Sequence, residues 1–226
     1  MTMWLSVDPM ADKYPSMSPY AYCAWNPMKL VDPDGKEIWI LGDNGKLYKY
    51  KNGKLYTASG DKYCGNDEFA NKVKTNLSQL KKMGIRKEIR KMERSELIIT
   101  IGKGDKNSQC SLDDDGEVNP EIGSGSVITY NPTKTENNDG KRSPVFGLAH
   151  ELGHAYDAMK GKIDDTEVPI YKKGSNVTNK TIKYSEIRAV RFENRVRPAN
   201  NQRRTYDGYD LTPYNVVVKR KDGVIL

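Results

Sequence analysis

The stretch FGLAHELGHAYD, residues 146–157, contains both histidines of the 226-residue chain. His150 and His154 are four residues apart, and Glu151 directly follows the first of them. On an α-helix, side chains four residues apart lie one above the other on the same face, so the two imidazoles can bind one metal ion. The spacing therefore predicts a helix that supplies a metal site with two of its ligands.

The flanking residues favour a helix at this place. Ser143 is a good N-cap, and Pro144 suits the first helical position, where its missing N–H costs nothing. Gly161 is expected at the C′ position that ends the helix. Apolar side chains recur at helical spacing and give the helix a stripe to bury, formed by Val145, Leu148, Leu152, Ala155 and Met159.

The pattern H-E-x-x-H is typical of zinc hydrolases, in which the glutamate acts as base towards a water on the metal. We therefore expect His150 and His154 to bind Zn²⁺ and Glu151 to be catalytic. Gly153 leaves room for a neighbouring backbone or a substrate to approach the metal. The alternative is that both histidines are ordinary polar residues held by hydrogen bonds, with Glu151 on a solvated face.

A catalytic zinc ion takes three protein ligands and keeps one open position. Because the chain has no third histidine, the third ligand must be a carboxylate. Asp157 lies on the face of the two histidines, but it is a further turn away along a straight helix. A ligand from another part of the chain is therefore expected.

The stretch YSEIRAVRFENRVR, residues 184–197, predicts a second helix with Glu186 and Glu193 on one face. Carboxylates on an inward face are costly unless they are paired or bind a metal. We expect Glu186 to be the third ligand, because Ala189 one turn later lets the two helices approach closely. Glu193 is then a partner of a ligand or, failing that, the ligand itself. A salt-bridged surface stripe is the alternative.

Composition excludes several other classes of protein. Hydrophobic residues make up 36% of the chain and charged residues 30%, and the mean hydropathy is −0.78, which predicts a soluble domain. No apolar run is long enough for a membrane span, and no signal peptide is visible. The net charge of +7 is spread among acidic residues, so nucleic acid is not an expected partner. The cysteines are odd in number and far apart, which argues against a disulfide framework: Cys23, Cys64 and Cys110.

Other elements are expected upstream of the histidines. Asn-Gly pairs punctuate residues 37–60 and predict short hairpins there. Helical spacing of apolar residues predicts a helix over 66–83 that Gly84 ends, and a basic helix follows over 86–94. Residues 96–101 have the length and β-branching of a strand.

Residues 126–130 are expected to be the last strand before the histidine helix. We assign them the role of an edge strand that binds substrate as an added strand. Between the two strands, the acidic run at 113–117 does not have EF-hand spacing and is expected to be a solvated turn.

The first 36 residues differ in composition from the rest and contain five of the eleven prolines of the chain. The run WLSVDPMADKYPSMSPYAYCAWNPMKLVDPDG resembles the end of the rearrangement-hotspot (Rhs) repeat-associated core domain, in the form common among Bacteroidetes. The resemblance implies a large β-shell that encloses a C-terminal toxin. It also implies release by self-cleavage at a signature that this chain matches at Pro27, Asp32, Pro33 and Gly35.

Two positions depart from that family's pattern: Lys36 stands where a hydrophobic residue usually follows the glycine, and Ala11 replaces a glycine. Paired aspartates can share a proton and hydrolyse a peptide bond. Since nearly all of the shell is absent from this chain, we expect Asp8 and Asp32 to be structural here.

The segments HELGHA, at His150–Ala155, and SEIRAV with EN, ending at Asn194, resemble a family of bacterial effector zinc proteases. Some members are injected into host cells and cut signalling kinases, and related domains lie at the C-termini of Rhs-type toxins. The resemblance covers roughly residues 95 to 210. It implies a zincin fold and a gluzincin-like site of two histidines and a glutamate, and it does not carry over the substrate.

Together these features predict an α+β chain in three parts. Residues 1–36 form a β-rich Rhs-core remnant, 37–60 a hairpin linker, and 61–226 a zincin-like metallopeptidase domain with a small sheet, an active-site helix and a ligand helix. The oxyanion of peptide hydrolysis needs a further donor. The candidates are Tyr184, Tyr206, Tyr209, Arg197 and Arg203.

The function expected is zinc-dependent peptide hydrolysis by the C-terminal toxin of an Rhs-type effector. Its partners are then a protein substrate in a target cell, an encapsulating Rhs core and a cognate immunity protein, and no membrane. Such a protein is secreted or delivered by a specialised secretion system. A nucleic-acid-cleaving toxin and a catalytically inactive interaction module are the alternatives.

Overall fold

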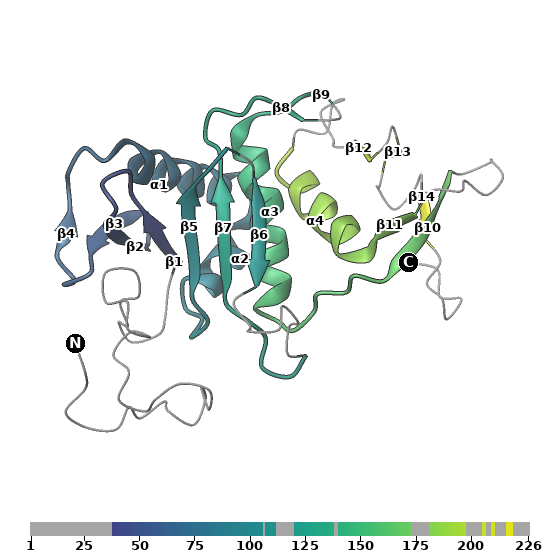
Figure 1. The fold of residues 1–226 in the computed structure, drawn as a ribbon, viewed down its shortest axis with the longest axis horizontal. Coiled ribbons are helices and arrows are strands. Elements are labelled where there is room, and N and C mark those ends of the chain that lie inside the picture. The colour runs from purple at the N-terminus through teal and green to yellow at the C-terminus, as the bar shows by residue number, and fades with distance from the viewer. Residues whose placement is uncertain are drawn as a thin grey trace.

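The computed structural model describes residues 38–105, 107–111, 120–137, 140–172, 181–197, 205–206, 209–210 and 216–218. These residues form an α+β fold in which helices cover one face of a mixed sheet (Figure 1). The stretch that resembles an Rhs core, the acidic run at 113–117 and Arg203 lie outside the described residues. No helix in the described part of the chain is long and apolar enough to cross a bilayer.

The main sheet has seven strands in the order β4-β3-β2-β1-β5-β7-β6. Four strands form an antiparallel meander at one end: β1 (Ile38–Leu41), β2 (Leu47–Lys51), β3 (Lys54–Thr57) and β4 (Lys62–Tyr63). Three strands complete the sheet: β5 (Ile99–Lys103), β7 (Ser126–Tyr130) and β6 (Ser108–Ser111). β5 is parallel to both β1 and β7, whereas β6 is antiparallel to β7.

The hairpins expected over 37–60 are present. Asn52 and Gly53 both have positive φ, 50° and 79°, as a tight two-residue turn between strands requires. These strands belong to the same sheet as β5, since Ile38 pairs with Ile99 and Ile40 with Ile101. The division expected near residue 60 therefore runs through one continuous sheet.

Two helices separated by a kink follow the meander. They are α1 (Glu68–Leu80) and α2 (Arg86–Met92), and the segment η3 (Lys81–Ile85) between them contains the kink. The two helices expected here are confirmed. Gly84, with a φ of 127°, is not helical and forms a kink between the two helices, so it ends the first of them as the sequence predicts.

Two strand predictions need correction. The strand expected at 96–101 lies three residues later, at Ile99–Lys103. The edge-strand assignment of 126–130 is wrong, because β6 pairs with the outer side of β7 and is itself the edge. A small hairpin, β8 (Glu136–Asn137) and β9 (Gly140–Lys141), also separates β7 from the next helix.

The remaining elements lie beside the sheet. The helix α3 (Pro144–Ala158) packs on β6 and β7, and α4 (Tyr184–Asn194) packs on α3 (Figure 1). Beyond α4, a three-stranded sheet has the order β11-β10-β14. The last short strands are β10 (Glu167–Lys172), β11 (Thr181–Lys183), β12 (Thr205–Tyr206), β13 (Tyr209–Asp210) and β14 (Val216–Val218).

The hydrophobic core lies between the main sheet and the helices α1, α2 and α3. It contains a polar pair, since the Asn76 side-chain amide of α1 donates to the hydroxyl of Tyr130 on β7 at 2.7 Å. Both side chains are buried. A buried amide needs such a partner, so this bond fixes how α1 sits on the sheet.

We predict that Tyr130→Phe lowers the free energy of unfolding by about 1–3 kcal/mol, because the Asn76 amide then loses its buried acceptor. Tyr50→Phe is the matched control. The Tyr50 hydroxyl is 3.4 Å from the Ser78 hydroxyl, which keeps its own bond to the Lys74 carbonyl at 2.9 Å. Urea denaturation should show a loss of about 1 kcal/mol or less in the control. Equal losses in both variants would contradict the role given to the Asn76 pair.

Candidate metal centre

The helix α3 begins and ends where the sequence predicts. Ser143 has the extended backbone of an N-cap, although its side chain makes no capping hydrogen bond, and Pro144 is the first helical residue. At the other end Gly161 has a φ of 63°. The Gly161 N–H donates to Ala158 at 2.9 Å and the Lys162 N–H to Asp157 at 2.8 Å. This pair of bonds is a Schellman motif with Gly161 at C′, as expected.

The helix α4 lies against α3 at a glycine. A Cβ atom at Gly153 would be 3.1 Å from the Cβ of Phe192 and 3.2 Å from the Cα of Ala189. The backbone that Gly153 admits is therefore that of α4, and the close approach expected at Ala189 is confirmed. One turn further along α3, Asp157 forms a two-bond ion pair with Arg188, so its carboxylate is already engaged.

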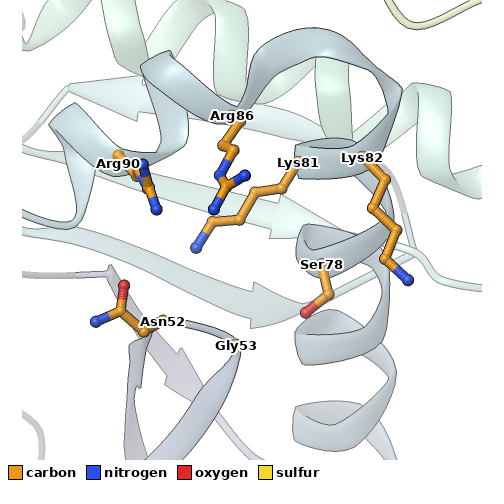
Figure 2. Close-up of a pocket in the computed structure, with 7 residues that line it drawn as sticks. All are labelled: Asn52, Gly53, Ser78, Lys81, Lys82, Arg86 and Arg90. Carbon is orange, nitrogen blue, oxygen red and sulfur yellow. The ribbon is translucent and has the colours of Figure 1, made fainter.

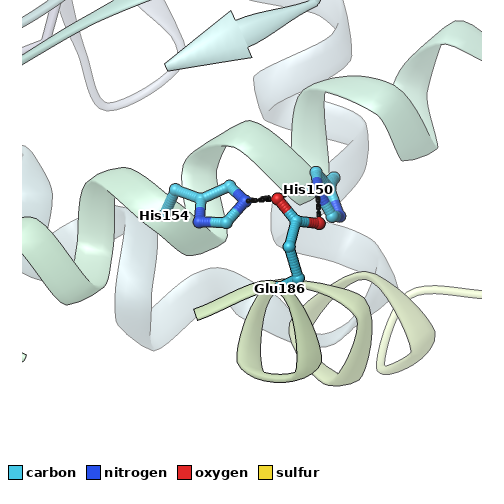
Figure 3. Close-up of side chains that lie close together, drawn as sticks. All are labelled: His150, His154 and Glu186. Atoms are coloured by element: carbon cyan, nitrogen blue, oxygen red, sulfur yellow. Dashed lines mark hydrogen bonds and ion pairs between the residues drawn. The ribbon is translucent and has the colours of Figure 1, made fainter. Parts of the chain in front are cut away.

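This packing brings His150, His154 and Glu186 together (Figure 3). The two Nε2 atoms are 3.3 Å apart, and each lies 3.3 Å from a different oxygen of the Glu186 carboxylate, His150 from Oε2 and His154 from Oε1. In a tetrahedral zinc site with bonds of about 2.0–2.1 Å, ligand atoms are about 3.3–3.4 Å apart. Each of these pairwise distances is within the range for two zinc ligands, and imidazole and carboxylate are groups that zinc accepts.

The charge of Glu186 suits a ligand. Partial burial disfavours its ionised form, but the hydrogen bonds and the nearby charges of His150 and His154 outweigh burial and lower its pKa. The carboxylate is therefore held in its ionised form, which is the form that coordinates metals.

Glu193 lies on the opposite side of His150. Its Oε2 is 3.4 Å from His150 Nδ1, and its side chain is fully buried. Arg142 donates to both of its oxygens, at 2.9 and 3.2 Å, and Arg197 donates at 2.6 Å. A carboxylate on Nδ1 leaves Nε2 free for a metal, so this geometry fits a partner of a ligand and not the ligand itself.

Residues 57–216, more than half of the chain, match the family model Peptidase_M91, which is described as an effector protein. The chain belongs to the Peptidase_M91 family. The match includes α3, α4 and all three clustered residues. No curated protein matches the chain. The resemblance of the histidine and glutamate segments to effector proteases is confirmed at the level of the family, and the Rhs resemblance of residues 1–36 stays a prediction.

In this M91 chain, Glu151 lies on α3 between the two histidines and is buried. Burial raises its pKa, and the nearby charges of His150, His154 and Arg142 oppose that rise only in part. Within the described residues Glu151 makes no hydrogen bond or ion pair. Its carboxylate is therefore a stronger base than an exposed one and has capacity to bind a water.

Sequence reasoning missed Arg142. It lies just before α3, 51 residues from Glu193 in the chain, and no local pattern links the two. Of the oxyanion candidates, Arg197 is engaged by Glu193 and lies over the Phe146 ring, with its guanidinium carbon 4.8 Å from the ring centre. The side chains of Tyr206 and Tyr209 are not among those described.

We predict that Glu186→Gln reduces zinc affinity by more than the roughly 10–100-fold expected for a residue that only supports a ligand. The fold should persist, because the Glu186 side chain is one-third exposed and, among the described residues, its ion pairs are those with the two rings. Zinc titration against a chromogenic chelator, with circular dichroism for folding, checks this. The matched control is Glu167→Gln, which changes an exposed glutamate on β10 and should leave zinc affinity unchanged.

Glu193→Gln should behave differently. It removes the carboxylate that binds two buried guanidinium groups, so we expect a loss of roughly 3–5 kcal/mol in stability. If Glu186→Gln binds zinc like the unmodified chain, the assignment of Glu186 as a ligand is wrong.

Proposed function

We propose that this chain is a zinc-dependent endopeptidase that hydrolyses a protein of a target cell. The observation that carries the proposal is the convergence of His150, His154 and Glu186, whose ligand atoms all lie within 4.8 Å of one another, beside a buried glutamate. Membership of the M91 effector family supports the same reaction.

His150, His154 and Glu186 would hold the ion, which when bound polarises the scissile carbonyl and acidifies water. Glu151 then accepts a proton from the attacking water and passes it to the leaving amine. Glu193 keeps the His150 ring oriented through Nδ1. The oxyanion donor is one of the tyrosines or arginines proposed from the sequence: Tyr184, Tyr206, Tyr209, Arg197 and Arg203.

We place the backbone of the substrate along β6. In the described part of the sheet, β6 is the edge strand next to α3, and its outer backbone groups are available for pairing. An extended peptide can add there as a further strand. This role was assigned to β7 from the sequence, and it passes to β6 because β7 is paired on both sides.

Delivery to the target cell by a specialised secretion system, within an Rhs core, is also a proposal. It rests on the effector family and on the Rhs resemblance of residues 1–36. A protease of this kind requires a cognate immunity protein that covers its cleft in the producing cell. Co-expression with the products of adjacent genes tests this, and failure of all of them to suppress toxicity would count against it.

We predict that Glu151→Gln lowers proteolysis by about 10²–10⁴-fold and leaves zinc binding unchanged, because the base is lost while the ligands remain. The measurements are cleavage of an unfolded protein substrate and zinc content of the purified chain. Glu68→Gln, the same change at an exposed position on α1, is the control and should keep full activity.

A comparison of the unmodified chain with Glu151→Gln can also identify the target protein. New N-termini should appear in target cells that receive the active chain and should be absent with Glu151→Gln. Full proteolysis by Glu151→Gln would exclude the proposed mechanism.

A further inference from the structure

A second polar site shares no residue with the metal centre. A cavity of about 650 Å³ lies between the β2–β3 turn and the helical run from α1 to α2. Figure 2 shows Lys81, Arg86 and Arg90 pointing their nitrogens towards the turn, while Lys82 extends to the other side of Lys81. The lining residues are Asn52, Gly53, Ser78, Lys81, Lys82, Arg86 and Arg90.

The positive charge around this cavity is only partly balanced. The ammonium of Lys81 lies 2.5 Å from Glu93, whose carboxylate also accepts the Asn52 N–H at 3.2 Å. Glu93 thus joins the turn to the helix and neutralises one cation. Within the described residues the other three lining cations have no hydrogen bond or ion pair: Lys82, Arg86 and Arg90.

The backbone gathers these cations at a cost to stability. The chain kinks at Gly84, and Lys81 and Arg86, on either side of the kink, both line the cavity. Arg86 and Arg90 are four residues apart on α2, a spacing at which like charges repel and destabilise a helix. An anionic ligand would remove that repulsion.

We propose that this cavity binds a small molecule that carries two phosphate groups. Guanidinium groups bind phosphate oxygens in pairs, and Arg86 and Arg90 supply two of them. A phosphate monoester carries about −1.5 to −2 charges at neutral pH, so two such groups match three unbalanced cations better than one does. The cavity volume is within the range of roughly 300–1,000 Å³ typical of small-molecule sites.

The lining favours a compact phosphorylated ligand over nucleic acid. No aromatic side chain is among the lining residues, so a nucleobase has no surface on which to stack. The Ser78 hydroxyl and the Asn52 side chain supply neutral hydrogen-bonding groups beside the cations. Together these groups recognise a compact polyanion.

The test is calorimetric titration of the full zinc-loaded chain with inorganic pyrophosphate and with inorganic phosphate. Pyrophosphate should bind with one-to-one stoichiometry and at least about 10-fold tighter than phosphate, since only it supplies both anionic groups. Arg86→Gln with Arg90→Gln should weaken pyrophosphate binding at least about 10-fold. Lys87→Gln with Lys91→Gln removes the same charge from two exposed positions of the same helix that do not line the cavity, and should change affinity less than about threefold.

Two further variants test whether binding needs the paired geometry of arginine and whether it is independent of the metal centre. Arg90→Lys keeps the charge but not the paired geometry, and should also weaken binding. Glu186→Gln should leave binding intact, because the cavity contains no metal ligand. Equal losses in the two double variants, loss of binding in Glu186→Gln, or equal affinity for phosphate and pyrophosphate would each overturn the proposal. Tighter binding of a phosphopeptide by the same arginines would overturn it in favour of a protein ligand.

Discussion

The close approach of α3 and α4 at Gly153 is the constraint on which the metal centre depends. On one side of Gly153, His150 contacts Glu193, and on the other side Asp157 forms an ion pair with Arg188. Residue numbers rise along α3 as they fall along α4, so the two helices run antiparallel. A side chain at position 153 would meet the Cα of Ala189 and push the helices apart. Glu186 reaches both rings only because that separation is short.

The packing of α3 against α4 also depends on buried charged side chains being paired. A carboxylate as buried as Glu193 is tolerated only with partners, and Arg142 and Arg197 provide them. Near the histidines, these two arginines and the glutamates 151, 186 and 193 sum to one negative charge when all are ionised, since 2 − 3 = −1. A divalent cation would more than offset that negative charge, since −1 + 2 = +1, and would stabilise the buried carboxylate of Glu151.

Local sequence patterns were enough to predict most residues of the candidate metal centre and part of the fold. Helix period, caps and Asn-Gly turns are properties of adjacent residues, so α3, α4 and the meander could be predicted. Glu186 and Glu193 lie two turns apart on one face, and only helix packing distinguishes their roles. The strand β6 has the polar sequence SQCS, which has no strand period, so the sheet edge was misplaced. The parallel pairing of β1 with β5 joins distant segments and leaves no local signal.

The two sites are linked by one helix. At its N-terminal end α4 carries Glu186, and just beyond its C-terminal end Arg195 contacts the helical run that lines the cationic cavity. The Arg195 guanidinium lies 2.8 Å from Glu88 of α2 and donates to the Gly84 carbonyl, at the kink between α1 and α2, at 3.4 Å. A Cβ at Gly84 would be 3.5 Å from the Arg195 carbonyl oxygen. The position of α4 therefore depends on the same kink that lies beside the cations, because a rigid helix cannot move at one end alone.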